Sequence, residues 1–233
     1  MRINKFIAKS GITSRRKADE LIKNGLVKVN GQRISEPGLD IKDSDQVEVN
    51  GQVIGIEEKF YIKVYKPVGF ITSNYDPHND KDLNDLVKVD KKFFAAGRLD
   101  KDSEGLLIVT NDGDFTNRII HPRQKLDKEY IVKVDKKLSK KEEDLFQRGI
   151  DIGRGEITSD AKIKLLDPKK NTYRVIIHQG FNRQIRRMFG YFNVNVLSLK
   201  RIRIGEIKLS DMKPYDNRYF DEGELSFVKK VKV

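Results

Sequence analysis

The sequence predicts an α+β protein with a small first domain over residues 1–55 and a larger second domain over residues 60–233. Two-residue alternation of apolar and polar residues, which is typical of strands, dominates the second domain. Helical stretches occur at irregular intervals and do not separate successive strands, which favours a mixed, mostly antiparallel sheet with flanking helices. Residues 52–59 combine a glycine with a charged run and are predicted to link the two domains.

The first domain is predicted to contain two helices followed by two strand–turn segments. Residues 3–11 form a helical pattern with one apolar face and a Ser-Gly stop. Ser14 is placed to cap a second helix, and Gly25 supplies the left-handed residue that ends it. Residues 27–31 and 47–51 each alternate and finish in Asn-Gly, a strong signal for a tight turn between strands.

The second domain is predicted to contain several strands and two capped helices. Ser139 and Glu142 form a capping box that begins one helix, which Gly149 ends. Asn182 is placed to cap another helix that continues to Phe192. Strands are expected over five ranges: 60–65, 106–110, 130–134, 172–177 and 194–204.

The charge distribution predicts a nucleic-acid partner. Lys and Arg number 47 and Asp and Glu 35, which gives a net charge of +12 and a pI of about 9.6. Residues 1–33 hold nine cations against two acids, and residues 178–205 hold six cations and no acid. Such stretches suit phosphate contacts. A membrane surface is not expected to be the partner, because the helix expected after Ser14 has too few apolar positions.

Several classes of chemistry are disfavoured by the composition. The absence of Cys excludes disulfides, zinc–cysteine sites, iron–sulfur clusters and thiol nucleophiles. His78, His121 and His178 are far apart, and a calcium-like loop that starts at Asp100 has Asn111 where a bidentate Glu is needed. Neither a Walker-type phosphate loop nor a dinucleotide fingerprint occurs. We therefore expect no metal and no cofactor. The sequence offers no transmembrane stretch or signal-peptide core, so we expect a cytoplasmic protein. We also expect it to be a monomer.

Residues 97–107 are dense in side chains capable of chemistry and lead into a predicted buried strand. Asp100 follows Arg98 by two residues, and a cap-like Ser103 precedes the strand. From the residues alone, this segment is equally well a polar loop in which Asp102 and Ser103 make turn hydrogen bonds.

This segment resembles the catalytic motif of pseudouridine synthases, in particular the family of bacterial RsuA, RluB, RluE and RluF. Residues 65–69, 128–130 and 179–188 resemble three further motifs in family order: the first motif of the catalytic domain, the segment with an active-site tyrosine and an arginine-rich motif. Residues 1–55 resemble the RNA-binding domain named after ribosomal protein S4. Gln179, Phe181 and the run 200–204 are similar to the RluF-like branch.

The resemblance implies an enzyme that isomerises a specific uridine of ribosomal RNA, with the large subunit as the expected source. It implies that Asp100 is essential, that Arg186 pairs with it, and that Tyr130 stacks on uracil and serves in proton transfer. The uracil must detach from ribose, turn and rejoin through carbon five, which requires neither redox nor metal chemistry. Attack on the base, attack on the anomeric carbon and removal of a ribose proton all stay open for Asp100.

We expect the cations near these motifs to contact RNA. Arg98 is expected to fill the space of the displaced base or to hold a neighbouring phosphate, and Lys66 either lines the pocket or faces solvent. Asp102 is expected to shape the turn. The remaining predicted phosphate contacts are Arg15, Arg16, Lys17, Arg183 and Arg187.

Three alternatives remain open at this level. The first alternative is that the substrate is a transfer RNA rather than ribosomal RNA. The second is that the chain is a non-catalytic RNA-binding or ribosome-assembly protein, for which residues 1–55 alone are sufficient. The third alternative is a hydrolase that uses Asp100 and Asp102 as paired carboxylates.

Overall fold

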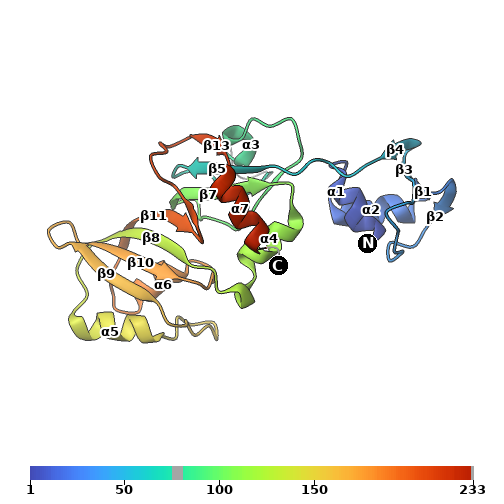
Figure 1. Ribbon diagram of the computed structural model, residues 1–233. Helices are drawn as coiled ribbons and strands as arrows, with labels where there is room; N and C mark the ends of the chain where they lie inside the picture. The colour runs from blue at the N-terminus through green and yellow to red at the C-terminus, as the bar shows by residue number, and fades with distance from the viewer. Residues whose placement is uncertain (75–80, 232–233) are drawn as a thin grey trace. The chain divides into compact units, whose positions relative to one another are not determined.

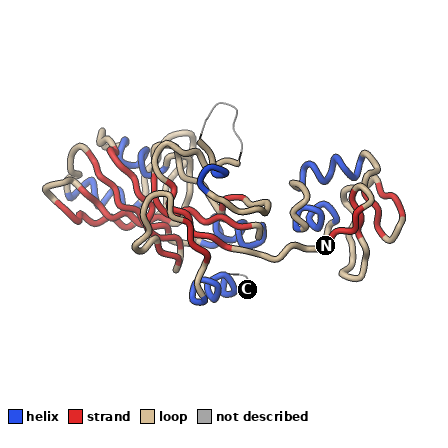
Figure 2. Tube along the Cα trace, turned by 90° about the horizontal axis from the view of Figure 1, so that it is seen from above, coloured by secondary structure: helices blue, strands red, loops and turns tan. Residues whose placement is uncertain are grey.

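The structure, a computed structural model, describes residues 1–74 and 81–231 (Figure 1). The chain divides into two compact units. The first comprises residues 1–60 with the short segments 89–93 and 111–113, and the second comprises the remaining residues. The predicted domain limits of 1–55 and 60–233 remain predictions. The α+β class is confirmed, and Figure 2 shows its strands in red and its helices in blue.

The first unit contains the two predicted helices and an antiparallel sheet with the strand order β2-β1-β3-β4. The Ser14 side chain accepts a hydrogen bond from the backbone N–H of Lys17 and so caps the second helix. Asn30 and Asn50 adopt positive φ angles of 51° and 50° in the two Asn-Gly turns, as tight hairpins require. The elements are α1 (Ile3–Lys9), α2 (Arg15–Lys23), β1 (Val27–Val29), β2 (Gln32–Ile34), β3 (Val47–Val49) and β4 (Gln52–Ile54).

The second unit is built on one nine-stranded sheet. Its main path runs β13-β5-β7-β11-β8-β10-β9, with β6 paired to β7 and β12 paired to β11. Every pair is antiparallel except β7 with β11, which confirms the predicted mixed, mostly antiparallel sheet. The strands are β5 (Tyr61–Lys66), β6 (Phe94–Ala95), β7 (Glu104–Thr110), β8 (Lys128–Val134), β9 (Lys162–Asp167), β10 (Thr172–Ile177), β11 (Val196–Ile204), β12 (Ile207–Lys208) and β13 (Asn217–Tyr219).

Two apolar clusters hold helices against this sheet. In one cluster, Phe146 of α5 and Phe189 of α6 lie with ring centroids 5.0 Å apart and cover the face of β8 and β10 that carries Tyr173 (Figure 1). In the other, α4 and α7 pack on β5 and β7. The helices are α3 (Leu83–Leu86), α4 (Gly113–Ile120), α5 (Lys140–Arg148), α6 (Gln184–Gly190), α7 (Glu222–Val231) and the short 3₁₀ helix η1 (Pro122–Gln124).

The parallel contact between β7 and β11 depends on a glycine. Gly105 has φ of +106°, and an added Cβ would lie 2.3 Å from the carbonyl oxygen of Arg201. Only a residue without Cβ allows this approach. The predicted capping box of α5 is present, whereas α6 begins after Arg183 in a left-handed conformation and has no side-chain cap, so the prediction that Asn182 caps it is wrong.

Candidate active site

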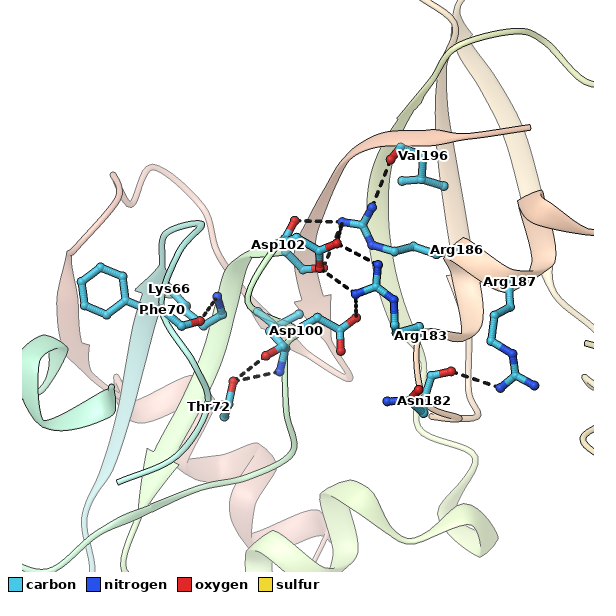
Figure 3. A network of polar contacts seen from close by, with 12 residues as sticks. Lys66, Phe70, Thr72, Asp100, Asp102, Asn182, Arg183, Arg186, Arg187 and Val196 are labelled. Atoms are coloured by element: carbon cyan, nitrogen blue, oxygen red, sulfur yellow. Dashed lines mark hydrogen bonds and ion pairs between the residues drawn. The ribbon is translucent and has the colours of Figure 1, made fainter. Parts of the chain in front are cut away.

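The loop between β6 and β7 fixes the backbone around Asp100. The Thr72 hydroxyl donates to the carbonyl of Leu99 at 2.7 Å and accepts from the Leu99 N–H at 3.1 Å (Figure 3). The N–H of Ser103 donates to the carbonyl of Asp100 at 3.0 Å. Leu99 itself is buried, and the Asp100 side chain is 32% exposed. The carboxylate is therefore carried by an anchored loop and is accessible to a ligand.

Arg183 lies between two carboxylates. Its guanidinium donates to both carboxylate oxygens of Asp102, at 3.0 and 2.8 Å, and one of its nitrogens lies 3.7 Å from Asp100 Oδ2 (Figure 3). These bonds from Arg183 lower the pKa of Asp102. Arg183 adopts φ of 50°, a conformation that a branched or long residue rarely takes and that is concentrated at functional sites.

Arg186 does not make the expected pair with Asp100. Its guanidinium donates to the carbonyls of Asp102, at 2.8 Å, and Val196, at 3.0 Å, and lies 3.3 Å from the Asp102 carboxylate. Arg183 lies within ion-pair distance of Asp100 instead. Asp102 therefore does more than shape a turn, because it connects both arginines to the Asp100 loop.

A pocket of about 460 Å³ opens beside Asp100. That volume lies in the range of small-molecule sites. Tyr130 lines it and is 7% exposed, with Leu99 and Phe181 adding further apolar surface. Arg98, which is exposed, also lines the pocket. The structure thus brings Asp100, Tyr130, Arg98 and Arg183 to one pocket.

Two further cations line this pocket. Arg201 is 3% exposed, lies opposite Tyr130 in the β8–β11 register, and donates to the carbonyls of Leu106 at 2.8 Å and Arg98 at 3.2 Å. Lys128 donates to two backbone carbonyls, and its burial lowers its pKa to about 8. Sequence reasoning did not place either cation in the pocket. Period-two alternation from Tyr130 would have placed Lys128 on the same strand face.

Two sequence-predicted cations of the second unit, Lys66 and Arg187, do not line the pocket. Lys66 is fully buried, so it neither faces solvent nor lines the pocket; it donates to the carbonyls of Pro67 and Phe70, and burial lowers its pKa to about 8. Arg187 donates to Ile152, Gly153 and Asn182 carbonyls and pairs with Glu156. These contacts join α6 to the segment around residues 152–156, and the phosphate contact of Arg187 stays a prediction.

The remaining predicted contacts lie in the first unit. Arg15, Arg16 and Lys17 form the first turn of α2 and are exposed. Within the described residues, no group of three His, Asp or Glu side chains is arranged to hold a metal ion, and His78 lies outside those residues. No helix in the described part of the chain has the length and apolarity needed to cross a membrane.

Comparison with known proteins identifies relatives along the whole chain. Residues 60–191 match the family described as RNA pseudouridylate synthase, and residues 1–47 match the S4 domain. Ribosomal large subunit pseudouridine synthase B of Bacillus subtilis is 42% identical over 233 residues, covering 96% of this chain and 93% of the relative. Dual-specificity RNA pseudouridine synthase RluF of Escherichia coli K12 is 39% identical over 97% of this chain and 77% of the relative. A crystal structure of a pseudouridylate synthase superposes with a TM-score of 0.72 at 27% identity and covers 99% of each chain.

Proposed function

The chain belongs to the RNA pseudouridylate synthase family and carries an S4 domain, and we propose that it converts one specific uridine of large-subunit ribosomal RNA to pseudouridine with Asp100 as the catalytic carboxylate. Asp100 is chosen because of one observation: it is an accessible carboxylate beside a pocket of about 460 Å³, with Arg183 at 3.7 Å. The large subunit is chosen because the Bacillus subtilis relative is named for it.

The proposed reaction is an isomerisation in which atoms and electrons balance without an oxidant or reductant. The bond between N1 of uracil and the anomeric carbon breaks, the base turns, and carbon five forms the new bond to the anomeric carbon. Carbon five then loses its proton and N1 gains one, so the net change is zero. Asp100 acts at the base or the ribose, and the cation of Arg183, 3.7 Å away, orients this carboxylate. The fork of Arg183 suits this role because it engages Asp102 at the same time.

The other pocket residues are assigned by their position around the base. Tyr130 offers its ring for stacking on uracil and its hydroxyl for proton transfer at carbon five. Lys128 and Arg201 line the same pocket as Tyr130 and are held in place by backbone carbonyls, and their charge stabilises negative charge that develops on uracil as it detaches from ribose. Arg201 also positions the loop, since it holds the carbonyl of Arg98, two residues before Asp100.

The base must leave its stack before it reaches this pocket, at a cost of a few kcal/mol. Arg98 is exposed beside the pocket and can fill the vacated space or hold a neighbouring phosphate. Remote phosphate contacts supply binding energy that offsets the displacement of the base. We assign part of this binding to the exposed cations of α2, which are Arg15, Arg16 and Lys17.

Mapping pseudouridine in ribosomal and transfer RNA from cells that lack this protein tests the proposal. The expected result is the loss of one modification in large-subunit RNA, and its return when the wild-type chain is supplied. A second substrate in transfer RNA is a candidate because the Escherichia coli relative is named a dual-specificity enzyme. Unchanged pseudouridine at every site in both RNA classes would reject the proposed substrates and favour a binding-only role.

A further inference from the structure

Strands β8 to β11 have one face that no helix of the described chain covers. Their alternating residues divide cleanly: Tyr130, Tyr173 and Leu199 are buried on the side of α5 and α6, whereas Lys133, Arg174 and Lys164 are exposed on the other side. Figure 1 shows α5 and α6 on a single side of β8, β9 and β10. We call the uncovered side of these four strands the open face.

The open face is strongly cationic. One row across the sheet joins Lys164, Arg174, Ile131 and Lys200, and the next row joins Lys162, Ile176, Glu129 and Arg203. Counting both rows and Lys133, six cations stand against the single carboxylate of Glu129. The six cations are Lys133, Lys162, Lys164, Arg174, Lys200 and Arg203.

The few acids nearby do not neutralise the lysines. Glu129 is engaged by Arg203 at 2.7 Å and by Arg174 at 3.2 Å. Asp167, at the end of β9, accepts bonds from two backbone N–H groups of the β9–β10 turn. Within the described residues, the exposed side chains of Lys133, Lys162 and Lys164 form no ion pair with a carboxylate. Their charge is available to a partner.

The open face is separate from the catalytic pocket. A hollow of about 510 Å³ at its β11 end is lined by Glu129, Lys200 and Arg203. The catalytic pocket uses the alternate residues of the same two strands, Tyr130 and Arg201. Successive side chains of a strand point to opposite faces, so the two hollows lie on opposite sides of the sheet.

The side chains of the open face are suited to binding the phosphate backbone of folded RNA. None of the residues that the four strands contribute to the open face is aromatic, so this face offers single-stranded bases no stacking surface. Ile131 and Ile176 are half-buried between the cations, and the exposed large apolar side chains of the four strands are Leu166 near the end of β9 and Leu197 near the start of β11. These scattered side chains do not form the continuous apolar face that insertion into a membrane needs. We propose that the open face binds the phosphates of a double-helical segment of the substrate RNA, beyond the stem-loop whose uridine enters the catalytic pocket. This inference rests on the proposed RNA substrate.

A pair of matched variants tests the inference. The first replaces Lys133, Lys162 and Lys164 by Gln on the open face, and the control replaces Lys137, Lys140 and Lys141 by Gln around the start of α5. Affinity for a full-length large-subunit rRNA transcript and for the isolated target stem-loop is measured as a function of salt. The open-face variant should bind the long transcript more weakly, with a salt slope lower by about two to three, since each lost phosphate contact lowers it by about one.

The same variant should bind the isolated stem-loop like the wild-type protein and form pseudouridine in it at an unchanged single-turnover rate. The control should match the wild-type protein on both RNAs. Equal loss in both triple variants, equal loss on both RNAs, or unchanged affinity for the long transcript would overturn the inference. Loss of binding to anionic lipid vesicles without loss of RNA binding would assign the face to a membrane instead. If the wild-type protein forms no pseudouridine, the proposed function fails, whereas the binding comparison still decides the role of the open face.

Discussion

Replacing Arg183 and Arg186 separately by Met distinguishes the arginine that pairs with the Asp100 carboxylate from the one that supports the structure. The expected result is that Arg183→Met lowers the rate at saturating RNA with little loss of stability, whereas Arg186→Met mainly lowers stability. The reason is their different surroundings. The side chain of Arg183 is 43% exposed and faces Asp100 and Asp102, whereas that of Arg186 is 13% exposed and holds two backbone carbonyls.

The magnitudes follow from these contacts. At 3.7 Å between partly exposed side chains, the Arg183–Asp100 attraction contributes about 1 kcal/mol after solvent screening. A reoriented carboxylate adds a larger kinetic effect, so the rate should fall roughly ten- to hundredfold. Arg186→Met leaves the carbonyls of Asp102 and Val196 without a donor, which costs about 2–4 kcal/mol in total. Such a loss lowers Tm by roughly 5–15 °C.

Single-turnover rates at saturating RNA and thermal unfolding measure the two effects separately. Arg183→Lys keeps a positive charge without the planar fork and should recover part of the rate. The reasoning is refuted if Arg186→Met unfolds like the wild-type protein but has no activity while Arg183→Met turns over normally. In that case Arg186 is the partner of Asp100 in the reacting complex, as the sequence motif predicts.

Three further outcomes are expected. Gly105→Ala should lower stability by at least about 3 kcal/mol in urea titrations, because its Cβ meets a backbone oxygen at 2.3 Å, while Gly190→Ala, with open space around it, should not. The rate at saturating RNA should fall as pH rises through about 8, because Lys128 then loses the positive charge that stabilises the departing uracil. Lys128→Met should be slow at pH 7 and should not show this fall. The control Lys66→Met should still show it, since Lys66 has a similar pKa but does not line the pocket. The third change replaces three exposed cations of α2, Arg15, Arg16 and Lys17, together by Ala. This variant should bind ribosomal RNA more weakly and with a smaller salt slope, and its rate at saturating RNA should not change.

The sequence predicted the elements whose signals are local. The capping box at Ser139, the two Asn-Gly hairpins and the buried strand β7 all depend on residues close together in the chain. The start of α6 could not be predicted in this way, because Arg183 adopts its left-handed conformation while its side chain is held by Asp102, 81 residues away. Helix α4 and strand β9 were not predicted at all, and β9 is recognised only through its pairing with β10.

The family resemblance predicted which residues meet at the candidate site, but it predicted their contacts with one another less well. Asp100 and Tyr130 do reach one pocket, but the ion-pair partner of Asp100 depends on how α6 lies against the β7 loop, which spacing alone does not determine. The buried positions of Lys66 and Arg201 were missed for a similar reason. From the sequence, a Lys or Arg in a strand is expected to face solvent. Lys66 and Arg201 are buried because backbone carbonyls from other parts of the fold accept their hydrogen bonds, and the sequence does not show these contacts.

Single-turnover formation of pseudouridine by purified protein tests the central claim most directly. Wild-type protein, Asp100→Asn and the control Asp144→Asn, whose carboxylate lies on α5, are each incubated with unmodified large-subunit rRNA, and pseudouridine is detected by carbodiimide labelling beside a binding measurement. Asp100→Asn keeps the size of the side chain and removes its charge, so it should bind RNA normally and form no pseudouridine, while Asp144→Asn should match the wild-type protein. Turnover by Asp100→Asn at a near wild-type rate would contradict the assignment of the catalytic carboxylate.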